Sequence, residues 1–460
     1  MVALASFGEL VPDFGDRLVL PNSAGYDQAR RVWNGMVDRR PAAIVRCLDA
    51  DDVARCVRFA AAKALPVAVR GGAHNVAGFA TCDEGLVIDL SLMTRIQVDA
   101  GGRLARVAGG ATWADVDRAT QPFGLAVPGG IVSTTGVAGL TLGGGQGWLR
   151  RTYGMTCDSL VTAEMITAAG DRLSASEDRN EDLFWAIRGG GGNFGVVTEF
   201  TFRLHAVGPV VALAAPIYPL GSTPAILSGF AEFVTGAPDE VNATVTFWTV
   251  PHGSGFPSST HGRDVVIVSA IYVGPVEEGE RVLQPLRRLA EPLADMSTQI
   301  PYLGLQQMFD PFFPKGELRY YWKAMYLDRL DEESTATLMN AVRKRPSPIS
   351  MAVIWALGGA MARVDPGRTA VGARNAPYAV EILANWKEAA NTNENVSWAR
   401  ELFDALLRFS SGKPNLNFPG LAEESPGLVR AAFGSHYDRL LAIKRTYDPT
   451  NFFRLNQNIT

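Results

Sequence analysis

Hydrophobic and polar positions in the first 206 residues follow helical and strand periods in turn. Residues 51–65 place Val53, Cys56, Val57 and Ala60 at helical spacing behind an acidic start, which predicts a helix. Thr112 is expected to cap a second helix that ends near residue 122. A short helix is predicted at 181–187. Strands are predicted at 66–70, 86–90, 95–99, 104–108 and 196–204, with a hairpin formed by 160–168 and 172–175.

From about residue 208 the pattern changes to longer alternating segments, which predict an antiparallel sheet flanked by helices. Aromatic residues are dense in this half, as expected for a sheet that faces an apolar, ring-bearing ligand, although core packing accounts for most of them. The pattern as a whole predicts an α+β protein. The expected strands are 210–218, 243–250, 265–273, 318–327 and 350–356, and the expected helices lie near 225–235, 276–293 and 332–344.

Composition narrows the class of protein. A 460-residue chain with 47% hydrophobic and 20% charged residues is expected to be globular with two or three domains. A net charge of −4 argues against nucleic acid as the main partner, and no apolar run has the length of a membrane span. The N-terminal stretch lacks the basic start of a signal peptide, and the four cysteines form no Cys-x-x-Cys pair. We therefore expect a cytoplasmic protein with reduced, mostly buried thiols and no metal site.

The most informative chemistry is the segment 70–78, which reads Arg-Gly-Gly-Ala-His-Asn-Val-Ala-Gly directly after an apolar run. Glycine N–H groups in such a loop can turn toward a phosphate, and Arg70 would add a fixed positive charge. His74 has the reach to contact, or bond to, the group that carries the phosphates. A tight surface turn with an incidental histidine is the alternative interpretation.

Two further glycine clusters occur in the same half of the chain. Residues 128–147 contain glycines and small hydroxyl residues but no charge, so they would contact a ligand through backbone amides; a buried turn is the alternative. Gly190, Gly192 and Gly195 satisfy G-x-G-x-x-G, yet a predicted helix precedes them and a strand follows. A dinucleotide-binding Rossmann motif requires the opposite order, so we reject that assignment.

Together these segments resemble the FAD-linked oxidases of the berberine bridge enzyme family, within the vanillyl-alcohol oxidase superfamily. The resemblance covers nearly the whole chain, and its motifs are residues 70–74, 136–147, 184–198 and 447–458. It is strongest to the bacterial branch, which includes nicotine-degrading and antibiotic-tailoring oxidases of secondary metabolism.

The resemblance implies a PCMH-type FAD-binding domain of two α/β subdomains over residues 1–206, with its core at about 38–206. It further implies a substrate domain over 207–418 and a C-terminal segment, 419–460, that returns to the cofactor. His74 would be bonded to the flavin 8α-methyl, and a neutral imidazole is a suitable nucleophile for this step. The residues that the resemblance places around FAD are Arg70, Gly71, Gly72, Ala73, His74, Asn75, Gly78, Val132, Ser133, Thr134, Thr135, Gly136, Gly139, Leu142, Gly143, Gly144, Gly147, Gly195, Val197 and Asn456.

Some family features are absent from this sequence. Val132 stands where many plant relatives carry a cysteine bonded to the flavin, so no second covalent link is expected. Asn415 stands where a catalytic tyrosine is common, and Val353 stands where some relatives carry a glutamate. Tyr321 and Lys323, on one face of a predicted strand, are then the best candidates for the base, and Asn417 is a third candidate.

The resemblance implies an oxidase that removes a hydride from a C–H next to OH or NH of a small hydrophobic metabolite. Electrons would pass to O₂, and Thr135 falls where relatives place a residue that shapes oxygen access. An NAD(P)H-dependent flavin reductase with non-covalent FAD and a non-catalytic flavin or ligand carrier are the alternatives. We expect a monomer or a homodimer without a nucleic-acid or membrane partner.

Overall fold

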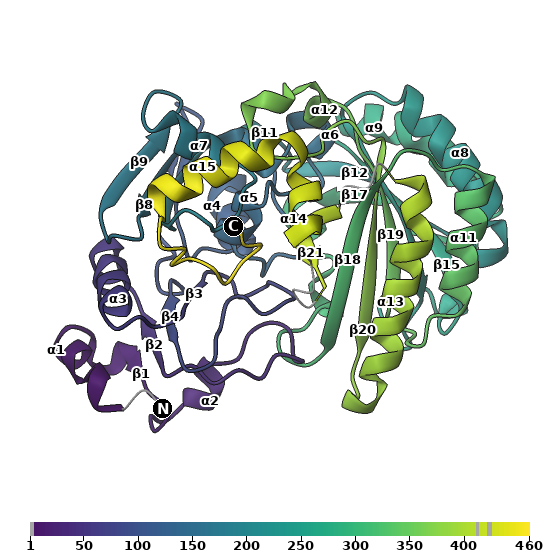
Figure 1. The fold of residues 1–460 in the computed structure, drawn as a ribbon. Helices are drawn as coiled ribbons and strands as arrows, with labels where there is room; N and C mark the ends of the chain where they lie inside the picture. Colours follow the sequence, from purple (N-terminus) through teal and green to yellow (C-terminus); the bar gives the residue numbers. More distant parts are fainter. Residues whose placement is uncertain (1–3, 411–413, 421–425) are drawn as a thin grey trace.

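The computed structural model describes residues 4–410, 414–420 and 426–460. Its N-terminal unit is a four-stranded sheet in the order β1-β2-β4-β3 (Figure 1). Strands β2, β4 and β3 are parallel because α3 carries the chain from β2 to β3. The helix predicted at 51–65 and the strands predicted at 66–70 and 86–90 are confirmed as α3, β3 and β4, whereas β2 was not predicted. The elements are α1 (Val11–Phe14), β1 (Leu18–Val19), α2 (Tyr26–Ala29), β2 (Ala43–Arg46), α3 (Ala50–Ala62), β3 (Val67–Arg70) and β4 (Leu86–Asp89).

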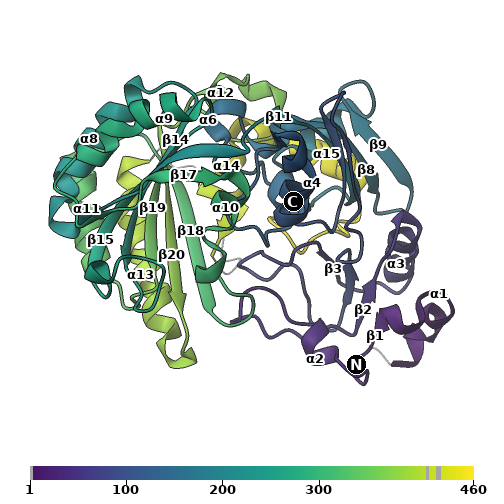
Figure 2. The same cartoon turned by 180° about the vertical axis from the view of Figure 1, so that it is seen from behind.

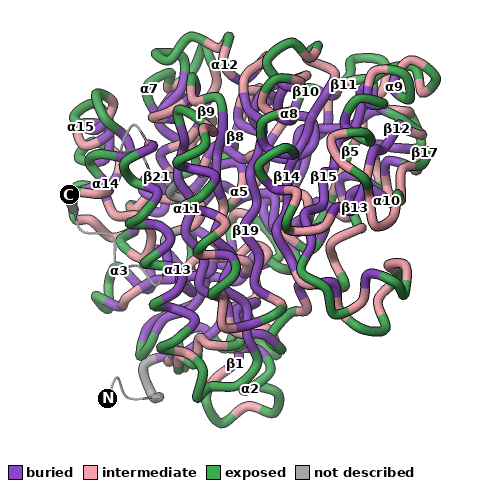
Figure 3. The backbone as a smooth tube through the Cα atoms, turned by 90° about the vertical axis from the view of Figure 1, so that its right-hand side faces the viewer, coloured by how far each residue is buried: buried purple, intermediate pink, exposed green. Residues whose placement is uncertain are grey.

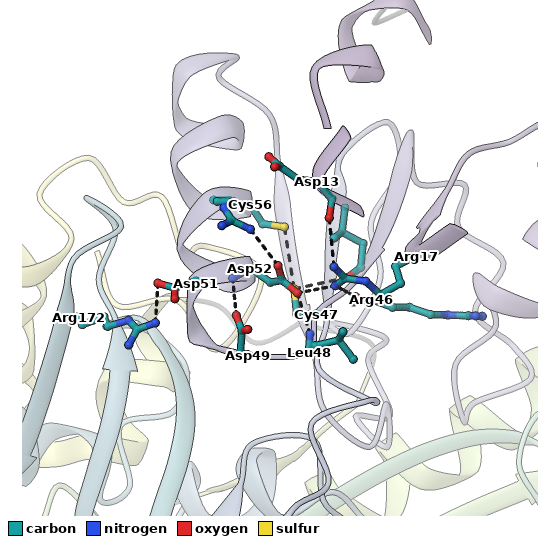
Figure 4. Close-up of polar contacts among 12 residues, drawn as sticks. Asp13, Arg17, Arg46, Cys47, Leu48, Asp49, Asp51, Asp52, Cys56 and Arg172 are labelled. Atoms are coloured by element: carbon teal, nitrogen blue, oxygen red, sulfur yellow. Dashed lines mark hydrogen bonds and ion pairs between the residues drawn. The ribbon is translucent and has the colours of Figure 1, made fainter. Parts of the chain in front are cut away.

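Asp52, in the first turn of α3, anchors the N-terminal segment to this sheet (Figure 4). Its carboxylate forms an ion pair with Arg17 and accepts the N–H of Leu48 at 3.0 Å. The Cys47 and Cys56 sulfurs lie 4.0 Å apart beside this network. All four cysteines are free and buried, which confirms the expected burial of the thiols. The strand β3, which leads into the candidate site, therefore belongs to a tightly anchored unit.

The second unit is an antiparallel sheet in the order β5-β6-β10-β8-β9, and it includes the predicted hairpin. The predicted cap of α4 is present, since the Asp115 carboxylate accepts the N–H of Thr112 at 3.0 Å. The sequence pattern missed α5, which lies inside the glycine block. The elements are β5 (Ile96–Asp99), β6 (Leu104–Ala108), α4 (Trp113–Thr120), β7 (Leu125–Ala126), α5 (Val137–Leu142), α6 (Arg150–Tyr153), β8 (Leu160–Ile166), β9 (Arg172–Ser176), α7 (Glu181–Ile187), β10 (Val196–Arg203) and β11 (His205–Ala206).

The second half forms one large antiparallel sheet along the path β16-β13-β15-β14-β19-β20-β18-β21, with β12 and β17 beside it. Two predictions need correction: 210–218 is two strands separated at Ala215, and the helix predicted at 276–293 ends at Leu283, two residues before Pro285. The strands are β12 (Val210–Ala214), β13 (Pro216–Pro219), β14 (Val241–Thr249), β15 (Asp264–Tyr272), β16 (Ala294–Asp295), β17 (Thr298–Pro301), β18 (Arg319–Leu327), β19 (Met351–Ala356), β20 (Tyr378–Trp386) and β21 (Pro414–Pro419). The helices are α8 (Thr223–Gly236), α9 (Val276–Leu283), α10 (Tyr302–Gln307), α11 (Glu332–Arg343), α12 (Ala360–Arg363) and α13 (Thr392–Leu406).

The two faces of the large sheet have different neighbours. Helices α8, α11 and α13 cover one face, where Phe230, Leu338 and Leu402 belong to one core (Figures 1 and 2). The opposite face packs on the first half of the chain, and Trp322 and Trp355 lie in that contact. Figure 3 shows the strands buried between these layers and the exposed positions on the outer helices. A site shared by the two halves must therefore use the face that carries Trp322 and Trp355.

The C-terminal helices lie against the first half of the chain (Figure 1). Helix α14 (Pro426–Phe433) follows β21, and α15 (Tyr437–Tyr447) packs beside α7. Leu440 of α15 shares a core with Leu183 and Phe184 of α7. The last residues of the chain thereby reach the glycine loop that follows α7.

Candidate functional site

A cavity of about 360 Å³ is lined by residues from both halves of the molecule. Glycine-rich parts of residues 71–76, 130–143 and 189–197 line one side. Aromatic side chains of the large sheet and its connections line the other, namely Phe313, Trp322, Trp355 and Phe418. The three glycine clusters, far apart in the sequence, therefore converge on one space beside an aromatic wall.

His74 is held in this cavity by the loop after β3. Ala73 has φ 57°, a left-handed conformation that turns the loop toward the cavity. The imidazole stacks on Trp33 with ring centroids 4.1 Å apart, and Trp33 stacks on Tyr320 at 3.8 Å. Nε2 of His74 lies 3.3 Å from Oγ1 of Thr134. These contacts orient the ring from two sides.

The same surroundings keep the imidazole neutral. Burial, with a smaller effect from the charge of Lys315, lowers the pKa of His74 to about 3. At neutral pH the ring therefore carries one N–H and one nitrogen lone pair. A neutral, oriented imidazole that lines a cavity is suited to act as a nucleophile.

The glycines fit a cofactor whose atoms approach the backbone closely. A Cβ on Gly72 would lie 2.3 Å from the amide nitrogen of Gly136, so only glycine allows these two loops to meet. Gly139 and Gly192 also line the cavity, but a Cβ there would meet no protein atom within 4 Å. Glycine at 72 and 136 is thus required by the protein's own packing. At Gly139 and Gly192, by contrast, bare backbone faces open space in the cavity. Such space is what a bound flavin dinucleotide requires.

The glycines at 190, 192 and 195 follow α7 and precede β10, which confirms that the Rossmann order of elements is absent there. Most residues expected around FAD line the cavity: Gly71, Gly72, Ala73, His74, Asn75, Val132, Thr135, Gly136, Gly139, Leu142, Gly143, Gly195, Val197 and Asn456.

The side chain of Arg70 is not among the residues that line the cavity. It is buried at the end of β3, where it donates to the carbonyl oxygens of Ala29 at 2.5 Å and Ala80 at 3.1 Å. It also lies 3.5 Å from the Asp89 carboxylate. The guanidinium therefore fastens the loop 71–80 from behind, because its hydrogen bonds are made to the protein rather than into the cavity.

The other expected residues that do not line the cavity support the loops that do. Gly78 and Gly144 adopt φ 76° and 100°, and a Cβ on Gly147 would lie 1.7 Å from a backbone oxygen. Ser133 is hydrogen-bonded to the second half of the chain, since its N–H and Oγ donate to Asp310 at 2.8 and 2.5 Å. Thr134 contacts the imidazole of His74, as described above. These positions fix the geometry of the loops that line the cavity.

Asn456 reaches the cavity because a buried lysine organises the C-terminal turn. Lys444 donates to the carbonyl oxygens of Asn193 and Phe453 and to the Asp448 carboxylate at 2.7 to 2.9 Å. Nδ2 of Asn456 donates to the Gly192 carbonyl at 3.2 Å, while its Oδ1 is buried and has no protein partner in the described part of the chain. That oxygen is available to accept a hydrogen bond from a bound cofactor.

Tyr321 and Lys323 lie on the opposite face of β18 from the cavity. Arg400 of α13 donates to the Tyr321 hydroxyl at 3.2 Å, and the Lys323 ammonium lies 4.4 Å from the ring centroid of Phe403. Trp322, between them in sequence, lines the cavity instead. Successive side chains of a strand point to opposite faces, so Tyr321 and Lys323 face away from the cavity that Trp322 lines. This position rules against Tyr321 and Lys323 as the base.

Asn417, the third candidate, does line the cavity. Its Nδ2 donates to the Gly143 carbonyl at 3.2 Å. A Cβ on Gly143 would lie only 1.9 Å from Oδ1 of Asn417, so the glycine is needed for this approach. The amide thus links β21 to the glycine block at the edge of the cavity.

The sequence interpretation missed Glu381, the carboxyl group that lines the cavity. It lies in β20 and pairs with Val353 of β19, the position at which some members of the family carry a glutamate. Burial raises the pKa of Glu381 to about 7, while the Trp355 indole and the charge of Arg150 act in the opposite direction. A carboxyl that titrates near neutral pH beside an aromatic wall is suited to proton transfer. Glu381 is the one charged residue of β20, a strand that is otherwise apolar except for Asn385, and this was the signal in the sequence.

Two classes of feature are absent from the ranges that the structure describes. No group of three or more histidine, cysteine, aspartate or glutamate side chains there could hold a metal ion. No helix there is both long and apolar enough to span a bilayer.

Comparisons with known proteins agree with this geometry. The FAD binding domain family matches residues 41–176, and the family described as berberine and berberine like matches residues 416–460. The chain is 34% identical over 457 residues to (R)-6-hydroxynicotine oxidase of Paenarthrobacter nicotinovorans, covering 96% of each protein. It is 32% identical over 455 residues to the FAD-linked oxidoreductase YgaK of Bacillus subtilis, again covering 96% of each.

Solved structures show the same similarity. The structure matches 6-hydroxy-D-nicotine oxidase from Arthrobacter nicotinovorans with a TM-score of 0.86 and 31% identity, covering 96% of this chain and 97% of that one. A chitooligosaccharide oxidase matches with a TM-score of 0.87 at 21% identity over 99% of each chain, which shows a shared fold.

Proposed function

Because the chain belongs to the berberine bridge enzyme-like FAD-linked oxidoreductases, we propose that it is an oxidase with FAD attached through His74 alone. The reaction would remove a hydride and a proton from a C–H next to OH or NH of a hydrophobic metabolite. O₂ would take up the two electrons and two protons as H₂O₂. We propose that residues 1–206 form the FAD-binding domain, that 207–418 form the substrate domain, and that 419–460 form a C-terminal segment that returns to the cofactor.

The observation that carries this proposal is the continuous cavity between His74 and Glu381. When bound, FAD supplies the hydride acceptor. Backbone at Gly139 and Gly192 and the free Oδ1 of Asn456 would hold it, and neutral His74 would form the covalent bond. Val132 lines the cavity with an apolar side chain, so the position offers no thiol for a second bond.

Glu381 is our candidate for the base, in place of Tyr321 and Lys323. Its carboxylate would accept the O–H or N–H proton of the substrate, since hydride removal from the adjacent carbon is favoured as that proton leaves. Asn417 lines the same cavity with a neutral amide. Thr135 also lines the cavity, consistent with the proposed role in oxygen access.

The walls favour a flat or cyclic apolar substrate. Phe313, Trp322, Trp355 and Phe418 offer aromatic surface, and Glu381 is the ionisable group on that wall. The relative (R)-6-hydroxynicotine oxidase is named for a cyclic amine, which supports an amine donor. An alcohol donor fits the same carboxylate, and we propose a secondary metabolite of either class.

A denaturing gel tests the attachment. Wild-type protein should retain flavin fluorescence after acid precipitation, whereas His74→Ala should lose it. His205→Ala is the matched control, because His205 is an imidazole outside the cavity, bonded to Ser159. If His74→Ala keeps fluorescence, the attachment residue is wrong. If wild type releases its flavin, the reductase or the carrier becomes the better assignment.

Anaerobic mixing tests the reaction. (R)-6-hydroxynicotine serves as the amine probe and 1-phenylethanol as the alcohol probe. Bleaching of the flavin by either, with peroxide formed when air returns, supports the oxidase. Bleaching by NADH alone would support the reductase instead.

A further inference from the structure

Arg150 is an arginine enclosed between the two halves of the molecule. It lies in α6 with 0% of its surface exposed. Its Nε, Nη1 and Nη2 donate to the carbonyl oxygens of Ala356, Gly147 and Ala243 at 2.9, 2.9 and 2.7 Å. The acceptors lie on β19, on the glycine block and on β14. The guanidinium plane is thus fixed by backbone from the FAD side and from the large sheet.

This plane lies against the cavity wall. The guanidinium carbon is 4.4 Å from the ring centroid of Trp355, which itself lines the cavity. Trp355 pairs with Ala379, and Val353 pairs with Glu381, so Trp355 and Glu381 are diagonal neighbours on two adjacent strands. The Trp355 indole therefore contacts a fixed cation and lies on the same sheet face as the candidate base, one diagonal position away.

The charge of Arg150 acts on Glu381 across the buried side chain of Trp355. Burial lowers the pKa of Arg150 to about 9, so the group remains cationic at neutral pH. Burial raises the pKa of Glu381 to about 7, and both the Trp355 indole and Arg150 lower it from the value that burial alone would produce.

Two other titratable groups that the structure describes beside the cavity or close to Glu381 carry no charge at this pH. Burial raises the pKa of Tyr326 on β18 to about 12, and burial lowers the pKa of His74 across the cavity to about 3. Neither therefore offsets the effect of Arg150 at neutral pH.

We propose that Arg150 is a positioning residue that holds Trp355 in the cavity wall and keeps Glu381 ionised for catalysis. This inference rests on the proposed role of Glu381 as the base. A planar guanidinium suits this place because it can stack on an indole while all three nitrogens are bonded in its own plane. Lysine would supply the charge without the planar stack, and methionine would supply volume without charge.

The ionisation of Glu381 can be measured without turnover. Infrared spectra of the holoprotein are recorded from pH 5 to 9, and the Glu381→Gln spectrum is subtracted, so that the acid carbonyl band reports Glu381 alone. The same difference is taken in the Arg150→Met background. We expect the midpoint, near 7 in wild type, to rise by about one unit in Arg150→Met. Arg150→Lys should restore it to within about half a unit.

Arg151 provides the matched control. It is also largely buried, and it donates to the carbonyl oxygens of Leu357 and Ala237, but it does not line the cavity or lower the pKa of Glu381. Arg151→Met should reduce the melting temperature and leave the midpoint unchanged. An unchanged midpoint in Arg150→Met, or an equal shift in Arg151→Met, overturns the proposal.

A second variant covers the case in which Arg150→Met does not fold. Arg150→Gln keeps a planar group that can donate to the backbone carbonyls and removes the charge, and it should also raise the midpoint. No shift in that variant would refute the arrangement.

Reduction kinetics then separate this proposal from the proposed function. With a probe that bleaches the flavin, the rate of flavin reduction is measured against pH. In Arg150→Met the acid limb of this profile should move to higher pH together with the infrared midpoint, which lowers the reduction rate at pH 6 about tenfold. A shifted infrared midpoint without a shifted limb would refute Glu381 as the base while keeping its electrostatic coupling to Arg150.

Discussion

Replacing Glu381 by glutamine is the sharpest test of the proposed chemistry. The substitution keeps the shape of the side chain and removes its ability to accept a proton. A positioned general base contributes about 10²- to 10⁴-fold to rate, so the flavin of Glu381→Gln should be reduced at least about 100-fold more slowly. The substrate should still bind, because the aromatic wall is unchanged.

The pH dependence follows from the position of Glu381. With a pKa raised by burial to about 7, about 1% of the carboxyl is ionised at pH 5 and about 90% at pH 8. The wild-type rate of reduction should therefore rise about 90-fold over this range and then level off. Glu381→Gln should lack this rise.

Stopped-flow absorbance under anaerobic conditions measures the rate directly, since flavin bleaching is followed before oxygen enters. The amine probe has its own ionisation, so the alcohol probe, which does not titrate in this range, separates the two effects. A Glu381→Gln variant with the wild-type rate and the wild-type profile would show that another group accepts the proton. Covalent flavin content is the control, and it should equal that of wild type.

Three further predictions concern other parts of the structure. Burial raises the pKa of Asp117 from 3.8 to about 7, so its ionisation destabilises the fold as pH rises through this window, by up to about 4 kcal/mol. In chemical denaturation, Asp117→Asn should lose less stability between pH 5 and 8 than wild type does. An identical loss would refute the raised pKa of Asp117. Gly72→Ala places a Cβ 2.3 Å from the Gly136 nitrogen, so the variant should lose flavin content and melt at lower temperature, and normal flavin content would contradict this account of the loop contact. Lys323→Met should change the rate of flavin reduction less than about twofold, because the ammonium lies over Phe403 on the far face; a 100-fold loss would return Lys323 to the catalytic site.

Local sequence patterns were sufficient for much of the fold. The helix at 51–65, the hairpin near 160–175 and the strand at 350–356 were found because each has an apolar period within a few residues. Helix α5 was missed because Gly139 inside it and Gly136 and Gly143 at its two ends hide any helical preference. Strand β20 carries the usual apolar pattern, and it was overlooked although its pattern is as regular as that of β19.

Roles that depend on side-chain direction were harder to predict. Alternation in β18 showed that Tyr321 and Lys323 share a face, but the same pattern cannot say which face meets the cavity. The tertiary packing determines which face meets the cavity. Helix α13 covers the face of β18 that carries Tyr321 and Lys323, and Trp33 packs on the opposite face. Arg70 presents the same difficulty, because its carbonyl partners at Ala29 and Ala80 are brought to it by the fold.

Glu381 shows why a missing motif residue is weak evidence for a missing function. The sequence has valine at position 353, and sequence order alone does not show which residue of another strand lies beside it. In the sheet, Val353 and Glu381 are paired across β19 and β20, with side chains on the same face. A carboxyl moved to the partner strand can therefore reach the same cavity as one at the family position. The neighbours must then adapt, and the buried Arg150 behind Trp355 is the group that supplies the compensating charge. If this reasoning holds, exchanging the pair as Val353→Glu with Glu381→Val should retain part of the reduction rate that Glu381→Val alone abolishes.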